Sequence, residues 1–384
     1  MPKGGAGGPF EDLLVVDLTR VLAGPYCTML LADLGARVVK VERPGSGDDA
    51  RSFGPLQGGR SAYFDSLNRG KESIALDLKS PRGKEIFEAL LARADVLVEN
   101  FRPGVLRRLG YGWETLHERY PRLICAATSG FGQTGPMAGR PAYDMVVQAM
   151  GGIMSLTGHP GSPPTRVGTS IGDIAAGLFT AVGIGGALHH RARTGLGLYV
   201  DVSMLDSQVA ILENAIARHA ATGEVPGPLG SQHPSIAPFA AFATADGFLV
   251  IAAGNDALFA ELCACLGRRD LPIDGRFISN DARIGNANAL AKEIERALAT
   301  SSTAVWLARL EAAGIPCAPI QNVREVVSDP QVLARNMVIR AGGEPMAGNP
   351  IKLSAYPDPP TRPQAPELDS SRASLLAELG LDRD

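Results

Sequence analysis

The stretch LLVVDLTRVLAGPYCTMLLADLGARVVKVE, residues 13–42, contains the pattern that decides the fold. A β-branched run at 13–19 is followed by a helical pattern in CTMLLADLG and then by a second apolar run at 37–42. Strand, helix and strand in this order are typical of a βαβ unit, whose two strands are parallel. The stretch therefore predicts a parallel sheet.

The same alternation continues through the first half of the chain. Further strand-like runs, separated by helical patterns, lie at residues 73–78, 95–100, 123–129 and 198–203. Parallel strands joined by helices make right-handed crossovers, and ligands bind at the carboxyl ends of such strands. The segments around these strand ends are therefore candidate binding loops: 19–25, 42–47, 77–79, 99–102 and 129–135.

The second half of the chain has a different composition. The Gly/Pro-rich segment GEVPGPLGSQHPSIAP, residues 223–238, reads as a linker, and a hairpin pattern at 241–253, three helical patterns and CAPI at 317–320 follow it. From about 330 the chain reads as irregular. YPDPPTRPQAP, residues 356–366, must be extended because of its prolines, and we expect it to return along the first body.

These patterns predict an α/β protein with two domains. We expect a large domain with a Rossmann-like parallel sheet, formed by residues 9–224 and 335–384, and a smaller α+β domain at 225–334. Residues 1–8 are expected to form a flexible leader, because they contain a glycine run and no apolar segment of a signal peptide or anchor.

Composition argues against some binding partners and favours one cellular compartment. Lys and Arg number 37 against 40 Asp and Glu, so no basic surplus is available for a nucleic acid or an anionic membrane. The apolar stretch 174–188 is shorter than the roughly 20 residues that span a bilayer, and we expect it to be a buried helix. Five scattered cysteines favour a reducing compartment, so we expect a cytoplasmic protein.

Several cofactor motifs are absent from the sequence. No G-x-G-x-x-G follows a strand, and no Walker lysine motif, H-E-x-x-H, Cys/His cluster or G-x-S-x-G elbow is present. We therefore expect neither a nucleotide redox cofactor nor a metal. Carboxylates, arginines and glycine-rich turns remain as candidate chemical groups.

Asp173 is the carboxylate with the most suggestive position. It follows a glycine and precedes a long Ala/Gly-rich helix, where an N-cap aspartate would stabilise the helix by about 1 kcal/mol. Alternatively, the helix N-terminus keeps Asp173 ionised as a nucleophile for an activated acyl carbon. Asp144, the first helical residue after Tyr143, is likewise either a cap or the partner of a carboxylate pair. The local sequence favours the cap for Asp173 and leaves both readings open.

Six blocks of sequence, at 15–48, 68–84, 94–110, 141–158, 167–179 and 190–207, resemble the class III CoA-transferases, a family that includes α-methylacyl-CoA racemases. The resemblance covers nearly the whole chain. It implies coenzyme A as co-substrate, an interlocked dimer of ring-like subunits and a nucleophilic aspartate at position 173. We expect Asp144 and Tyr143 to be catalytic residues that form hydrogen bonds in the acyl pocket.

The resemblance assigns CoA contacts to residues that lie in or beside the candidate binding loops. These residues are Leu22, Ala23, Arg43, Leu76, Lys79, Asn100, Phe101, Arg102 and Arg108. Cations near strand ends suit the phosphates of CoA, and apolar residues suit its adenine and pantetheine arm. The residue types and the strand-end positions therefore agree with the resemblance.

Departures from the family pattern refine the expected reaction. Racemases have a histidine where this chain has Tyr143, and the formate-using branch has a glutamine where this chain has Leu22, which argues against both racemisation and formate or oxalate specificity. The segment 229–247 instead resembles a branch that acts on dicarboxylates.

We therefore expect CoA transfer from an acyl-CoA, taken as succinyl-CoA, to a dicarboxylic acid through an aspartyl mixed anhydride and an aspartyl-CoA thioester. Backbone N–H groups near 129–132 are expected to stabilise the oxyanion. Arg140, Arg166 and His233 are the candidates for binding the distal carboxylate of the acceptor. The alternatives are an acyl-CoA racemase or isomerase that uses the same CoA site, and a CoA-binding protein without catalysis.

Overall fold

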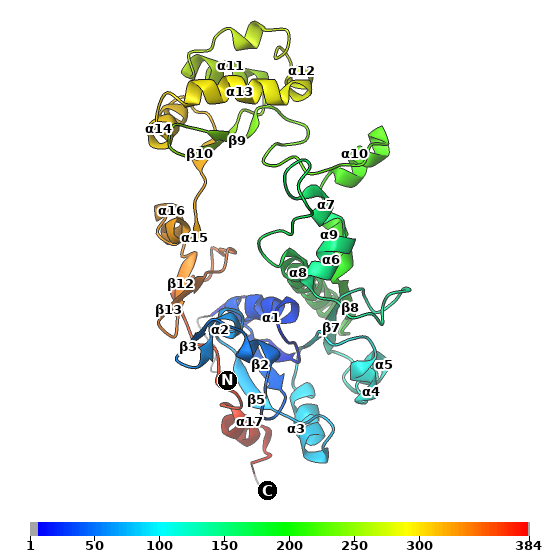
Figure 1. Ribbon diagram of the computed structural model, residues 1–384. Coiled ribbons are helices and arrows are strands. Elements are labelled where there is room, and N and C mark those ends of the chain that lie inside the picture. Colours follow the sequence, from blue (N-terminus) through cyan, green and yellow to red (C-terminus); the bar gives the residue numbers. More distant parts are fainter. Residues whose placement is uncertain (1–6, 383–384) are drawn as a thin grey trace. The chain divides into compact units, whose positions relative to one another are not determined.

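The computed structural model describes residues 7–382, which form two compact units (Figure 1). The first unit contains the chain up to residue 154, residues 166–224 and the chain from 330; the second contains 155–165 and 225–329. The second unit thus includes a segment, 155–165, that the sequence analysis placed in the large domain. Of the predicted leader, residues 1–6 lie outside the described residues, whereas Gly8 is buried.

A parallel sheet of six strands is the centre of the first unit. In spatial order the strands are β5 (Glu72–Ala75), β2 (Arg37–Glu42), β1 (Leu14–Asp17), β6 (Val96–Glu99), β7 (Ile124–Ser129) and β8 (Tyr199–Ser203). Each overlaps a strand predicted from the sequence, so the α/β prediction is confirmed. The order is that of a doubly wound sheet, and it reverses between β1 and β6, where such sheets bind ligands.

Helices cover both faces of the sheet. Alternate strand residues point to opposite faces, so Val16 packs in a core with α3 (Pro81–Leu91) and α5 (Trp113–Arg119). Its neighbour Val15 packs in another core with α1 (Ala23–Asp33) and α8 (Ile171–Thr194). The remaining α-helices of this unit are α2 (Ala62–Asn68), α4 (Val105–Arg108), α6 (Asp144–Met150), α9 (Met204–Ala210), α10 (Ala215–Thr222), α16 (Pro330–Ala334) and α17 (Arg372–Leu379). The residues of α7 (Ile153–Leu156) are divided between the two units after residue 154.

Helix α8 differs from its prediction in length and exposure. It has 24 residues rather than the 15 of the apolar stretch, because it begins earlier, at Ile171, and continues through polar residues to Thr194. Length and composition alone would suit a membrane span, but core helices of soluble proteins pass the same test, and α8 packs on α1, β7 and β8. One face is not buried: Leu178, Phe179 and Val182 are exposed.

The chain after residue 330 is more regular than expected. β12 (Val338–Ala341) and β13 (Glu344–Ala347) form an antiparallel hairpin, and β14 (Thr361–Arg362) pairs in parallel with β12. Gly342 and Gly343 form the two-residue turn at φ 62° and 91°, conformations that favour glycine. The irregular prediction for this segment was therefore wrong. Residues 356–366 lie along the first unit, where the carbonyls of Ala365 and Pro366 accept hydrogen bonds from Arg60 and Arg51.

The second unit has a small antiparallel sheet. Its order is β11 (Cys317–Pro319), β10 (Phe248–Ala252) and β9 (Phe239–Ala243), and its helices are α11 (Asp256–Cys265), α12 (Asn280–Gly285), α13 (Ala287–Leu298), α14 (Thr303–Ala312) and α15 (Val323–Val326). Leu249, Leu262 and Ile294 pack in its own core. The predicted hairpin and three helices are confirmed.

Candidate active site

The turn at residues 19–23, which follows β1 at the point where the strand order reverses, is held in an unusual conformation. Val21 has φ 68°, a left-handed value that is strained for a β-branched residue. Its N–H donates to Asp48 Oδ1 over 3.0 Å. The side chain of Asn100, which follows β6, accepts from the N–H of Arg20 at 2.9 Å and donates to the Arg20 carbonyl at 2.7 Å. The turn is thus fixed from both sides.

A buried cluster of charges lies behind the turn. Lys40 Nζ is 2.9 Å from Asp48 Oδ2 and Lys71 Nζ is 3.1 Å from Asp17 Oδ2, and all four side chains are fully buried. Burial raises the pKa of Asp17, but the charges of Lys71 and Lys40 lower that pKa more, so Asp17 stays ionised. Burial lowers the pKa of Lys71 to about 8. Lys40 also donates to the Thr19 carbonyl at 2.8 Å, which connects the cluster to the turn.

Asp173 is the third residue of α8 and not its N-cap. The helix begins at Ile171 after Ser170, so the predicted cap position was wrong. The reason lies in α6, where Asp144 Oδ1 accepts a hydrogen bond from the N–H of Gly172 at 2.8 Å. Because Asp144 binds one of the free N–H groups at the start of α8, the side chain of Asp173 is not needed as a cap.

The ionisation of Asp173 also differs from the expectation. Burial and the negative charge of Asp144 raise the pKa of Asp173 to about 7, and a hydrogen bond from the N–H of Ala23 offsets only part of this rise. The helix N-terminus therefore does not offset the effects of burial and of Asp144 on the pKa of Asp173. A carboxylate with a pKa near neutrality is ionised in part at pH 7 and is more basic than an exposed aspartate.

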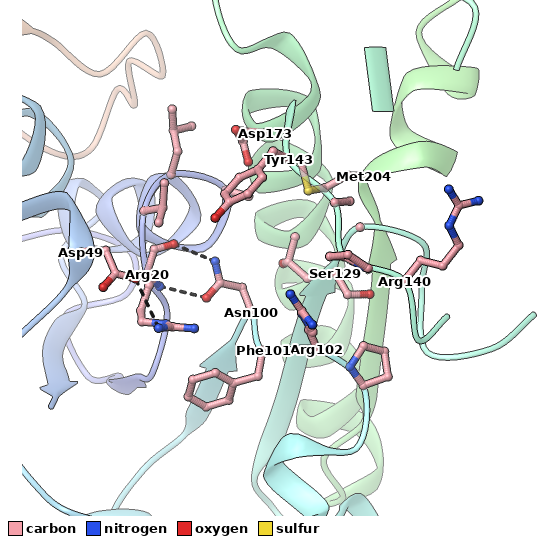
Figure 2. Close-up of a pocket in the computed structure, with 18 residues that line it drawn as sticks. Arg20, Asp49, Asn100, Phe101, Arg102, Ser129, Arg140, Tyr143, Asp173 and Met204 are labelled. Atoms are coloured by element: carbon pink, nitrogen blue, oxygen red, sulfur yellow. Dashed lines mark hydrogen bonds and ion pairs between the residues drawn. The ribbon is translucent and has the colours of Figure 1, made fainter. Parts of the chain in front are cut away.

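Asp173 lines a cavity of about 220 Å³, here called the nucleophile cavity (Figure 2). Its walls are the 19–23 turn and the residues after β6, β7 and before α6. Of the residues singled out in the sequence, it is lined by Leu22, Ala23, Asn100, Phe101, Arg102, Arg140, Tyr143 and Asp173. The structure therefore brings the predicted nucleophile together with five of the nine predicted CoA contacts and one candidate for the distal carboxylate.

A larger cavity of about 790 Å³, here called the groove, lies over the ends of β1, β2, β5 and β6. Of the predicted CoA contacts, Arg43, Leu76, Lys79, Phe101 and Arg102 line it. Arg108 is outside the lining, on helix α4, whose first residue Val105 belongs to the lining. Arg20, Phe101 and Arg102 line both cavities, so a long ligand in the groove can place one end at Asp173.

Comparison with known proteins identifies the family. The sequence pattern described as CoA-transferase family III matches residues 10–372. This chain belongs to CoA-transferase family III. It is 50% identical to the acetyl-CoA:oxalate CoA-transferase of Acetobacter aceti over 97% of this chain and 96% of the relative, and 44% identical to the succinyl-CoA:mesaconate CoA-transferase of Haloarcula hispanica over 97% of each.

A solved structure has the same fold. The CAIB/BAIF family protein from Brucella suis matches with a TM-score of 0.87 and 40% sequence identity, over 97% of this chain and 100% of that protein. Together these similarities over almost the full length establish that the chain is an enzyme, a CoA-transferase.

Not every predicted residue of this CoA-transferase lines the nucleophile cavity. Asp144 is 8% exposed, and besides Gly172 it accepts a hydrogen bond from Gln148 at 2.7 Å. Arg166 lies 3.8 Å from Asp144 and is outside the lining. His233 is in the second unit, where its Nδ1 accepts from the N–H of Ser235. Arg140 is thus the candidate for the distal carboxylate that shares a cavity with Asp173.

The sequence analysis did not single out Arg20, Ser129 or Gln148. Arg20 and Ser129 line the nucleophile cavity and lie inside the strand-end segments 19–25 and 129–135, so position alone was the available signal. Gln148 is fully buried, one turn after Asp144, and its amide also accepts from the N–H of Val167. Among the residues described, no group of three His, Cys, Asp or Glu side chains is arranged to hold a metal.

Proposed function

We propose that this CoA-transferase moves CoA from succinyl-CoA to a dicarboxylic acid, with Asp173 as the nucleophile. The observation that carries the proposal is the position of Asp173 in a cavity that shares Arg20, Phe101 and Arg102 with the groove. The groove contains Arg43 and Lys79, whose charges suit phosphates, and Leu76, which suits the apolar arm. The thioester end of CoA then enters the nucleophile cavity.

In the first half of the reaction, the Asp173 carboxylate attacks the thioester carbon of the donor. The C–S bond breaks, the CoA thiolate leaves, and an anhydride forms between Asp173 and the succinyl group. The thiolate then attacks the carbonyl carbon of Asp173. Succinate leaves, and Asp173 carries CoA as a thioester.

The second half reverses these steps with the acceptor. A carboxylate of the acceptor attacks the aspartyl thioester and releases the CoA thiolate, which gives an anhydride between Asp173 and the acceptor. The thiolate attacks the acceptor carbonyl, so the new acyl-CoA forms and the Asp173 carboxylate is restored. Atoms and charges balance over the cycle, and no proton is consumed or released. The N–H of Ala23 stabilises the Asp173 carboxylate when it is the leaving group.

The proposed acceptor class rests on the relatives and on Arg140. The two relatives compared above are named for oxalate and mesaconate, and both acids are dicarboxylates. Arg140 lines the nucleophile cavity and has no carboxylate partner among residues 7–382, since its side chain contacts the sulfur of Met137 and the ring of Phe131. We include oxalate among the acceptors to be tested, although Leu22 argued against it, because a relative 50% identical is named for oxalate.

We also propose a homodimer. Leu178, Phe179 and Val182 on α8 and Met145 on α6 are exposed in the single chain, and a soluble protein gains free energy by covering such side chains. Sedimentation of the purified protein at micromolar concentration should give twice the mass of the chain. A monomer at that concentration would exclude an obligate dimer.

The function is tested by product identification. The enzyme is incubated with succinyl-CoA or acetyl-CoA and with oxalate, mesaconate or glutarate in deuterated water, and new thioesters are identified by mass. We expect a dicarboxyl-CoA with succinyl-CoA as the better donor, and no product from Asp173→Asn. Deuterium at the α-carbon of an acyl-CoA without exchange of CoA would support the racemase reading instead, which Tyr143 disfavours.

A further inference from the structure

Ser129 has a hydroxyl group with no partner. It is the last residue of β7, its side chain is buried, and the residue is 6% exposed. Within residues 7–382, no hydrogen bond to Ser129 Oγ is formed. Its neighbour Thr128 behaves differently, because its Oγ1 lies 2.8 Å from Thr180 Oγ1. The unpaired hydroxyl is therefore specific to Ser129 and is not a general property of the end of β7.

Ser129 lines the same cavity as Asp173 (Figure 2). A buried hydroxyl without a partner costs free energy, and buried polar groups in native proteins nearly always have a partner. Alanine would occupy the same place without this cost. The hydroxyl is thus placed where a ligand in the nucleophile cavity can supply the missing partner.

The ligand group that reaches this cavity is the acyl end of the CoA thioester, if the proposed function is correct. That end has two kinds of oxygen: a distal carboxylate, which carries a full charge, and the thioester carbonyl, which becomes charged only during attack. Arg140 lines the same cavity and matches the full charge. A neutral hydroxyl suits the carbonyl, because a fixed donor is most effective where charge develops in the transition state.

We propose that Ser129 Oγ donates a hydrogen bond to the carbonyl oxygen of the acyl group while the Asp173 carboxylate attacks the carbonyl carbon. Ser129 is then a further catalytic residue, and it rests on the proposed function because the bond has a purpose only if Asp173 attacks an acyl carbon. The earlier expectation named backbone N–H groups near 129–132 for this oxyanion; the side chain of Ser129 is a donor of a different kind.

The chain offers a matched control. Ser203 is paired with Ser129 in the β7–β8 register and is 3% exposed. Its hydroxyl has a partner, because it accepts a hydrogen bond from the N–H of Asp206 at 3.1 Å and caps α9. It does not line the nucleophile cavity. Ser129→Ala and Ser203→Ala therefore make the same chemical change on adjacent strands, but only Ser203→Ala removes an internal hydrogen bond.

The test measures three quantities for each variant: the melting temperature without substrate, the single-turnover rate of succinate release from succinyl-CoA, and the KM for the acceptor in steady-state transfer. For Ser129→Ala we expect an unchanged or higher melting temperature and a release rate lower by about tenfold to a hundredfold. Ser203→Ala should melt lower, by roughly 1–3 °C, at the wild-type rate. Ser129→Cys, which keeps a weak donor, should release succinate at an intermediate rate.

The outcomes separate this proposal from the proposed function. A wild-type enzyme that releases no succinate would contradict the proposed function and, with it, this role. An active wild type with Ser129→Ala within twofold of its rate would contradict the Ser129 role alone. A lower melting temperature in Ser129→Ala would show that the hydroxyl stabilises the fold. A raised KM for the acceptor with normal succinate release would show that the hydroxyl binds the acceptor. Either result would overturn the proposal.

Discussion

The buried charge cluster and the nucleophile cavity both contact the 19–23 turn, but they differ in how their polar groups are paired. In the cluster, Asp17, Lys40, Asp48 and Lys71 are fully buried and paired with one another. In the cavity, the pKa of Asp173 is raised to about 7 beside another carboxylate, and the hydroxyl of Ser129 has no partner among the described residues. The cluster satisfies its own groups, whereas the cavity leaves its groups for a ligand.

This difference separates two kinds of contribution. The cluster holds Val21 in a strained conformation, and the turn then presents the N–H of Ala23 to Asp173. Strain of this kind persists only where the surroundings fix it. Changes in the cluster should therefore lower stability first, and changes in the cavity should lower activity while stability stays equal or rises.

The largest effect on stability is expected for Asp48→Ala. It leaves Lys40 buried without its 2.9 Å partner and the N–H of Val21 without an acceptor, so the free energy of unfolding should fall by about 3–5 kcal/mol. Asp49→Ala is the matched control, because its pairs with Arg20 and Arg43 are exposed and worth about 1 kcal/mol at most. Urea unfolding measures both, and equal losses would contradict the distinction between cluster and cavity.

Asp173→Asn should raise the free energy of unfolding, whereas Asp48→Ala should lower it. Because the pKa of Asp173 is raised from 3.8 to about 7 in the folded state, the folded protein binds a proton more tightly, and stability falls as pH rises between these values. Removal of the charge should raise the free energy of unfolding at pH 8 by roughly 1–3 kcal/mol and leave it unchanged near pH 4.

Glu99 also titrates near neutrality, since burial raises its pKa to about 7. Its own pH effect must therefore be removed from the comparison. Glu99→Gln keeps an acceptor for the N–H of Phe101, so the Asp173→Asn difference should be the same in that background. A loss of stability at pH 8 in either background would show that Asp173 is held by favourable contacts, as the cluster is.

The smallest expected effect concerns Arg140. If its guanidinium binds the distal carboxylate, Arg140→Met should raise the KM for dicarboxylates by about tenfold, roughly 1.4 kcal/mol, with little effect on a monocarboxylate of equal length. Arg166→Met is the control, because Arg166 lies near Asp144 and does not line the cavity. Equal losses for both acceptors would indicate a structural role for Arg140.

The sheet could be predicted from the sequence because its strands are local apolar runs and helices separate them. The hairpin at 338–347 was missed, although Gly342-Gly343 is a turn signal, because β13 begins with a glutamate and a proline and is mostly exposed, so it lacks the apolar pattern of a strand. The positive φ of Val21 had no local signal, since the acceptor that fixes it, Asp48, lies 27 residues further along the chain. Contacts between residues far apart in the chain do not produce a periodic pattern in the sequence.

The site was predicted in the same uneven way. Strand ends drew attention to loops that line the two cavities, because parallel strands place their carboxyl ends at one edge of the sheet. The role of Asp144 at the start of α8 depends on the packing of α6 against α8, which no spacing encodes. Whether a hydroxyl such as that of Ser129 has a partner depends on every neighbour in space, so only a structure can reveal it.

The most direct measurement of the central claim is the site of the covalent intermediate. The enzyme is mixed with succinyl-CoA without acceptor, quenched in acid, digested and mapped by mass, with parallel samples treated with hydroxylamine. We predict a CoA thioester, or the hydroxamate derived from it, on Asp173, and neither adduct in Asp173→Asn. An adduct on Asp144, or CoA exchange without any adduct in an active enzyme, would contradict Asp173 as the nucleophile.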